Sequence, residues 1–179
     1  RRKDLEKRMG KLLAEATYYA NGVELEIGSV NPEALRDGAV ESLIDNTFTK
    51  MAFVTPTDNP RLEMQAVLRC DDISSPDLDL ELPDHNPEAC KDLSEYIELS
   101  TSQNRQIILS ELVTRYERRP YGWPDDEVLL LLARLCAAGR IEFHKDGGEV
   151  SRGNLDATLA SARNHSSVKI HQRVSAESD

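Results

Sequence analysis

The sequence predicts an α+β fold dominated by helices, in which an N-terminal helix–β-hairpin–helix unit precedes a winged-helix-like domain. Apolar residues recur at three- and four-residue steps in several segments, which is the period of a helix with one buried face. In the second half, three such segments precede a two-stranded ribbon, the element order of a winged helix. We therefore predict the first unit over residues 1–70, an acidic linker over 71–86, and over 87–179 the winged-helix-like domain with an extra helix and strand.

The N-terminal unit is predicted from one helix, one hairpin and a second helix. The dipeptide Asn21-Gly22 predicts the hairpin between 18–20 and 23–27, because both residues tolerate the positive φ of a type I′ turn. The second helix is expected to begin after Asn31, with Pro32 at its first position. The first helix covers residues 1–17 and has an apolar face of Leu5, Met9, Leu12, Leu13 and Ala16. The apolar stripe of the second helix contains Leu35, Ala39, Leu43 and Ile44. A short helix over 62–68 follows.

The winged-helix-like domain is predicted from three helices and a ribbon. The predicted ranges are 87–99, 105–118 and 125–138 for the helices, then 140–144 and 149–151 for the strands. Pro124 and Gly139 bracket the third helix, which matches the usual preference for Pro at a helix start and Gly after its end. Beyond the ribbon we predict a helix from Asn154, as its cap, through Ala162, and a strand over 168–174.

The charge of the chain is unevenly distributed. Residues 1–100 contain 11 Lys and Arg against 21 Asp and Glu, whereas residues 101–179 contain 11 of each. The net charge of −10 therefore belongs wholly to the first half. From Asp71 to Glu98, ten acidic residues stand against Lys91 alone. Such a stretch repels phosphate, so we do not expect it to follow a nucleic-acid backbone.

The composition and the first residues of the chain indicate the cellular compartment of the protein. A hydrophobic content of 39 % with 30 % charged residues is typical of a folded soluble protein. No run approaches the roughly 20 apolar residues of a membrane span. The opening Arg1-Arg2-Lys3-Asp4 is not followed by the apolar segment of a signal peptide. Three widely spaced cysteines fit neither a disulfide framework nor a zinc site. We expect a cytoplasmic protein without a membrane partner.

The sequence carries no motif for catalysis or for a cofactor. Gly10-Lys11 has no upstream glycine at the spacing of a phosphate-binding loop, and there is no Gly-x-Ser-x-Gly, His-Glu-x-x-His or Cys-x-x-Cys. His144 and His171 fall in predicted strands, where exposed positions are the simplest interpretation and a pair in space is the alternative. We predict that this segment is not an enzyme and binds no cofactor or metal.

The segment from Arg118 to Glu127 is the most specific in the chain. Its two aromatic residues, Tyr121 and Trp123, are predicted to fill the corner between two helices, and this role alone accounts for its composition. The functional alternative is contact with DNA or a protein partner through nearby basic residues, namely Arg115, Arg118, Arg119, Lys145 and Arg152. Acids occupy the first turn of the third helix, where a DNA reader would place its contacts, so protein docking is favoured.

This corner also carries a resemblance to a known family. The run Arg119-Pro120-Tyr121-Gly122-Trp123-Pro124, with Ala138-Gly139-Arg140-Ile141 after an apolar helix, resembles a region of the large P-loop ATPase of bacteriophage-exclusion (BREX) defence systems. Residues 12–27 and 43–50 resemble the same family in the same order. The resemblance implies that the parent protein is an ATPase of phage defence. It also implies that the nucleotide site lies outside this segment.

We therefore expect a non-catalytic accessory segment of a multidomain ATPase. Its expected partners are other domains of that ATPase and other defence-system proteins, with at most a weak contact to DNA. The alternative is a transcriptional regulator whose winged helix reads DNA. The oligomeric state does not follow from the sequence.

Overall fold

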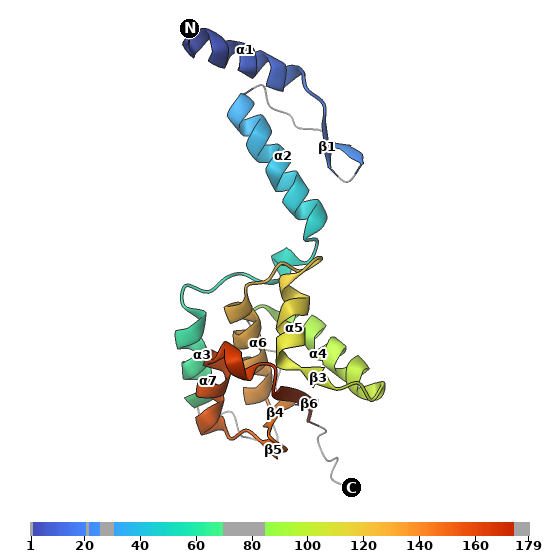
Figure 1. The fold of residues 1–179 in the computed structure, drawn as a ribbon, viewed down its shortest axis with the longest axis vertical. Coiled ribbons are helices and arrows are strands. Elements are labelled where there is room, and N and C mark those ends of the chain that lie inside the picture. The colour runs from blue at the N-terminus through green and yellow to red at the C-terminus, as the bar shows by residue number, and fades with distance from the viewer. Residues whose placement is uncertain (1, 21, 26–30, 70–84, 174–179) are drawn as a thin grey trace. The chain divides into compact units, whose positions relative to one another are not determined.

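The computed structural model describes residues 2–20, 22–25, 31–69 and 85–173 (Figure 1). The chain divides into two compact units, Arg1–Thr49 and Lys50–Asp179. The sequence predicts its first boundary at residue 70 instead. The difference arises because Met64 and Leu68 are buried in the hydrophobic core of the second unit. Most of the predicted linker, residues 71–84, lies outside the described residues.

The first unit has the predicted order of helix, hairpin and helix. Its elements are α1 (Arg2–Glu15), β1 (Tyr18–Ala20), β2 (Val23–Leu25) and α2 (Pro32–Thr47). The two strands pair in antiparallel fashion, with Tyr19 opposite Glu24. Asn31 caps α2, because its side-chain oxygen accepts a hydrogen bond from the backbone N–H of Glu33 at 3.0 Å. Asn21 and Ile27 of the predicted hairpin lie outside the described residues.

Burial in the first unit differs from the apolar patterns of its helices. Among its described residues, Leu35 alone is buried. Leu43 and Ile44 belong to the predicted stripe of α2, yet they are 46 % and 37 % exposed. The described part of α1 buries no side chain. The helical spacing of the apolar residues identified α1 and α2 correctly, but within the described part of the unit no other element covers their apolar faces.

The second unit is built from helices around a small sheet. It begins with a short 3-10 helix, η1 (Met51–Phe53), and the predicted short helix, which is α3 (Pro60–Arg69). The remaining elements are α4 (Pro87–Ser102), β3 (Ile107–Ile108), α5 (Leu109–Glu117), α6 (Asp125–Ala137), β4 (Ile141–Lys145), β5 (Gly148–Glu149), α7 (Arg152–Ala160), η3 (Ala162–Asn164) and β6 (Val168–Gln172). The order from α4 to β5 confirms the winged-helix fold, and the extra helix and strand follow it.

The four-stranded sheet has the order β3-β6-β4-β5, and all of its pairs are antiparallel. The β4–β5 ribbon turns at Asp146 and Gly147, whose φ angles of 53° and 86° are those of a tight hairpin turn. The strand at the chain's end, β6, lies between β3 and β4. The helices cover the face of the sheet that carries Ile141, Phe143 and Ile170, which are buried in the common core.

Two predicted helix starts are wrong. The segment 105–118 was expected to be one helix, but Ile107 and Ile108 form β3, because they pair with Ile170 and Lys169 of β6. The helix α7 begins at Arg152 after Ser151, and Asn154 lies inside its first turn. In the first case the local pattern fits a helix, but pairing with a distant strand sets the boundary.

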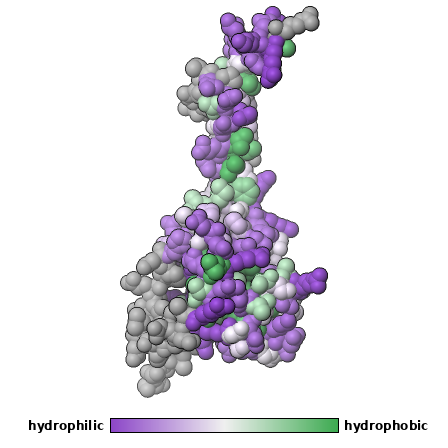
Figure 2. Space-filling model, turned by 90° about the vertical axis from the view of Figure 1, so that its left-hand side faces the viewer, coloured by the Kyte–Doolittle hydropathy of each residue, from purple (hydrophilic) through white to green (hydrophobic). Residues whose placement is uncertain are grey.

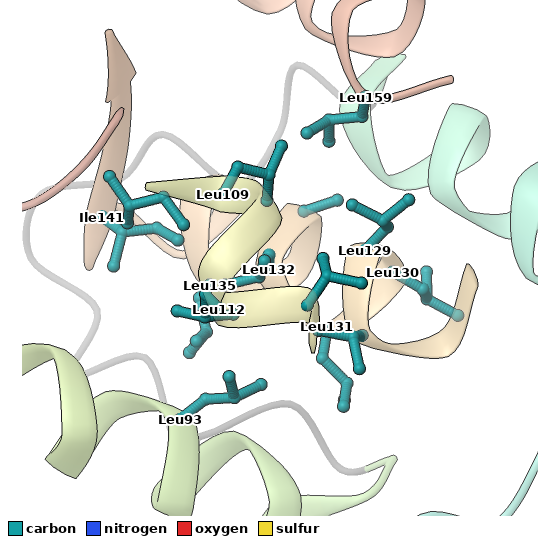
Figure 3. Close-up of a cluster of buried hydrophobic side chains, with 14 of the residues drawn as sticks. Leu93, Leu109, Leu112, Leu129, Leu130, Leu131, Leu132, Leu135, Ile141 and Leu159 are labelled. Atoms are coloured by element: carbon teal, nitrogen blue, oxygen red, sulfur yellow. The ribbon is translucent and has the colours of Figure 1, made fainter. Parts of the chain in front are cut away.

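The helix α6 is the centre of the core (Figure 3). Leucines from α4, α5 and α7 surround it, and Leu130, Leu131 and Leu132 are fully buried at consecutive positions. A helix with buried residues on all sides is an interior helix rather than a surface one. It ends at Ala137, and Gly139 lies just beyond its end as predicted, where a φ of 70° allows the backbone N–H of Arg140 to donate to the carbonyl of Leu135.

Candidate interaction surface at the helix corner

The corner between α5 and α6 is closed by stacked aromatic rings. Trp123 is 1 % exposed, and Tyr121 is buried beside it. The Trp123 and Tyr116 rings stack with centroids 4.8 Å apart, and Tyr121 lies 4.4 Å from Tyr116. The indole N–H of Trp123 donates to the carbonyl of Lys50 at 2.9 Å, which satisfies its one polar group.

Lys50 connects the start of the second unit to this corner. Its backbone N–H donates to the carbonyl of Pro120 at 2.9 Å, and its ammonium group pairs with Asp92. The hydrogen bond to Asp92 raises the pKa of Lys50. Asp92 also accepts a hydrogen bond from the Tyr116 hydroxyl at 3.1 Å. The corner is thus a fixed framework for the arginines around it.

Three of the five predicted contact residues line one open groove. Arg115, Arg118 and Arg119 lie along α5 and its end, and the groove has a volume of about 530 Å³. Its other lining residues are Ser110, Glu111 and Thr114. Within the part of the chain that is described, no carboxylate forms an ion pair with Arg118 or Arg119, and both residues are exposed.

Arg115 is held in place by aromatic rings. Its guanidinium carbon lies 4.3 Å from the centre of the Tyr96 ring, and 5.8 and 6.0 Å from those of Tyr121 and Tyr116. Such cation–π contacts fix the position of the charge without an acidic partner. The groove therefore has one positioned and two freely exposed guanidinium groups.

The other two predicted contact residues do not line this groove. The ammonium group of Lys145 donates to the side-chain oxygen of Asn164 at 3.0 Å. The guanidinium of Arg152 donates to the carbonyl of Ala137 at 2.9 Å, where it satisfies a backbone group at the end of α6. Both side chains stabilise the fold around the ribbon and α7.

The helix in the position of a recognition helix is covered by its own chain. Glu127, only 1 % exposed, accepts hydrogen bonds from the backbone N–H and the hydroxyl of Thr57. Asp126 pairs with Arg61 at 3.0 Å, and the buried Arg134 pairs with Glu63. The acids in the first turn of α6 thus hold the segment 57–63 in place. Sequence patterns did not indicate these contacts, because the partners lie about 70 residues apart.

The described residues contain no group of three His, Cys, Asp or Glu side chains arranged for a metal ion. His144 and His171 do lie side by side, with ring centroids 4.4 Å apart, but the nitrogen of His144 contacts Glu142 on the same strand. Burial raises the pKa of the Cys90 thiol to about 11, as for a core residue. None of the described helices has the length and apolar character needed to cross a membrane.

Comparison with known families agrees with the fold. Residues 50–174 match the winged helix-turn-helix domain of the BREX ATP-binding protein BrxC. The match begins at the residue where the second compact unit begins, and it ends just beyond β6. No solved structure gives a significant match to the chain. A winged-helix order and this match over most of the chain lead to one conclusion: the chain belongs to the family of BREX BrxC winged helix-turn-helix domains.

Proposed function

We propose that this BREX segment is a non-catalytic docking module, which binds other domains of its parent ATPase or other defence-system proteins. The winged helix is the rigid framework of that module, and its exposed arginines form the contact surface. In this proposal the segment binds no nucleotide or other cofactor of its own.

The burial of α6 is the observation that carries the proposal. A winged helix reads DNA by laying a recognition helix in the major groove, with the side chains near its start on the base edges. Here Val128 to Leu135 are all buried, and the first-turn acids Glu127 and Asp126 are bonded to Thr57 and Arg61. No basic face of α6 is available for a duplex, which argues against the alternative of a transcriptional regulator.

A weak contact with DNA is the second candidate, and it rests on the unpaired arginines. Arg118 and Arg119 are exposed cations that a phosphate backbone would attract. Residues 101–179 have no net charge, so such binding is expected to be sequence-independent. Non-specific duplex binding has a dissociation constant of roughly 10⁻⁴–10⁻⁶ M at physiological salt and weakens steeply as salt rises.

A DNA titration separates the docking module from the regulator. The 179-residue chain would be titrated against labelled duplexes of several sequences at two salt concentrations. The variant Arg118→Glu/Arg119→Glu would be compared with Arg105→Glu/Arg163→Glu, which changes the charge equally at two other exposed arginines. We expect weak or no binding without sequence preference. Nanomolar, sequence-selective binding would overturn the docking proposal.

An ATPase assay tests the non-catalytic part of the proposal. The purified chain is expected to show neither ATP turnover nor binding of a fluorescent ATP analogue. ATP turnover above a buffer control that co-purifies with the chain would contradict the proposal.

A further inference from the structure

We infer that the groove along α5 binds an acidic polypeptide segment, whose carboxylates pair with Arg115, Arg118 and Arg119. This inference rests on the proposed docking function and names the chemistry of the partner.

The groove follows one side of a helix. Most of its lining residues are spaced by one or three positions along the sequence, which places them on the same face of α5 and at its end. They are Ser110, Glu111, Thr114, Arg115 and Arg118. From Ser110 to Glu117 a helix rises by about 10 Å at 1.5 Å per residue. An extended peptide covers that length with about three residues at roughly 3.3–3.6 Å each. The groove therefore fits a short stretch of chain with two or three acidic side chains.

The donors of the groove suit carboxylates. A guanidinium presents five N–H groups in a fixed fork that binds a carboxylate through two parallel hydrogen bonds. Arg118 and Arg119 have no ion-pair partner among the described side chains, so a ligand does not have to displace one. The charge of Arg115 is already positioned over Tyr96, which lowers the entropy lost on binding. Ser110 and Thr114 add half-buried hydroxyl groups at the other end.

The surroundings of the groove favour a peptide over a duplex. Between Arg105 and Glu127 the chain has four arginines and five acids, and the exposed acids Glu117 and Asp125 lie outside the lining of the groove. A duplex has one phosphate per about 1.7 Å of its axis, so it would extend beyond the groove and meet these acids. A peptide of a few residues can place its carboxylates on the arginines alone. A peptide can also carry its charges at selected positions only, whereas a phosphate backbone carries one at every nucleotide.

The test uses a labelled hexaglutamate peptide and the whole 179-residue chain. Binding would be followed by fluorescence anisotropy, with a hexaglutamine peptide of equal length as the ligand control. We expect saturable binding of hexaglutamate only, weakened at least tenfold by Arg118→Glu/Arg119→Glu and less than twofold by Arg105→Glu/Arg163→Glu. Backbone amide shifts of the unmodified chain are expected to change at Ser110, Thr114 and Arg115, a readout that needs no variant to fold.

Three results would overturn the inference. They are equal binding of hexaglutamine, equal weakening by both pairs of substitutions, and shift changes located away from α5. A duplex that binds the groove more tightly than hexaglutamate and loses its affinity in Arg118→Glu/Arg119→Glu would assign the groove to nucleic acid instead. If hexaglutamate does not bind and DNA binds only weakly without sequence preference, this inference is refuted but the docking function is not. Sequence-selective DNA binding would refute the docking function itself.

Discussion

The two units of this chain place their apolar residues in opposite ways. In the second unit the helices close around α6, and nearly thirty hydrophobic residues form one buried cluster. In the first unit Leu35 alone is buried among the described residues, while Leu12, Met9 and Leu43 are among its exposed ones. Figure 2 shows hydrophobic residues among the hydrophilic ones at the surface of the first unit. An apolar stripe therefore predicts a helix, and only a neighbouring layer makes it a core.

Separating the units is expected to have the largest effect. Residues 50–174 should keep the full cooperative unfolding transition, because the buried cluster lies within them. Residues 1–49 should show no transition, since Leu35 alone is buried among the described residues of this unit, and such a small core cannot offset the conformational entropy of folding. Thermal melts followed by circular dichroism on both pieces would check this. A cooperative melt of the 1–49 piece would remove the contrast between the units.

Substitution of the corner aromatic is expected to have the next largest effect. Trp123→Ala removes a fully buried side chain and leaves a cavity beside Tyr116, so the free energy of unfolding should fall by about 3–5 kcal/mol. Denaturant titration measures this change. Trp123→Phe keeps an aromatic ring but loses the N–H donor to Lys50, so its loss should be smaller. A Trp123→Ala protein with an unchanged denaturant midpoint would refute the burial.

The tie between α6 and the upstream segment should contribute less. Glu127→Ala leaves the partly buried backbone N–H of Thr57 without its acceptor; because a fully buried unpaired donor costs about 1–3 kcal/mol, we expect a loss near the lower end of that range. Asp125→Asn is the matched control, because Asp125 is an exposed acid in the same helical turn. Hydrogen exchange at Thr57 is expected to speed up in Glu127→Ala and to stay unchanged in Asp125→Asn. Equal exchange rates in the two variants would show that the segment 57–63 is held by other contacts.

The smallest effect is expected in the first unit. Leu12→Ser and Leu43→Ser change exposed side chains, so each should alter the free energy of unfolding of the chain by less than about 0.5 kcal/mol. Binding of a dye that reports exposed apolar surface should fall in the double variant. A large destabilisation by either substitution would mean that these faces are covered in solution.

The sequence predicted the elements better than their partners. Helical periods and the helix-ending Gly139 located the seven helices, and strand alternation located the ribbon, because these signals act within a few residues. The strand β3 was missed, since two isoleucines acquire a strand geometry only through Ile170 and Lys169, far along the chain. The same holds for the early acids of α6, whose partners Thr57 and Arg61 lie in another part of the sequence.

The five predicted contact residues do not all lie together, and their contact with a partner stays a prediction. The arginines near the corner, Arg115, Arg118 and Arg119, fall within one helical turn and its end, so sequence proximity was enough to group them. Lys145 and Arg152 were grouped with them by their expected place near the wing tip. The structure gives each a hydrogen-bond acceptor, Asn164 and the carbonyl of Ala137, that no local pattern indicates.

The position of β6 has a consequence for how the chain acquires its fold during synthesis. Ile107 finds its partner strand at Ile170, so the edge strand β3 stays unpaired until more than sixty further residues have been made. Helices α4, α5 and α6 can pack together earlier, because their contacts with one another are closer in sequence. The sheet is therefore completed last, and a chain terminated before residue 168 would expose two unsatisfied strand edges, on β3 and β4, to neighbouring molecules.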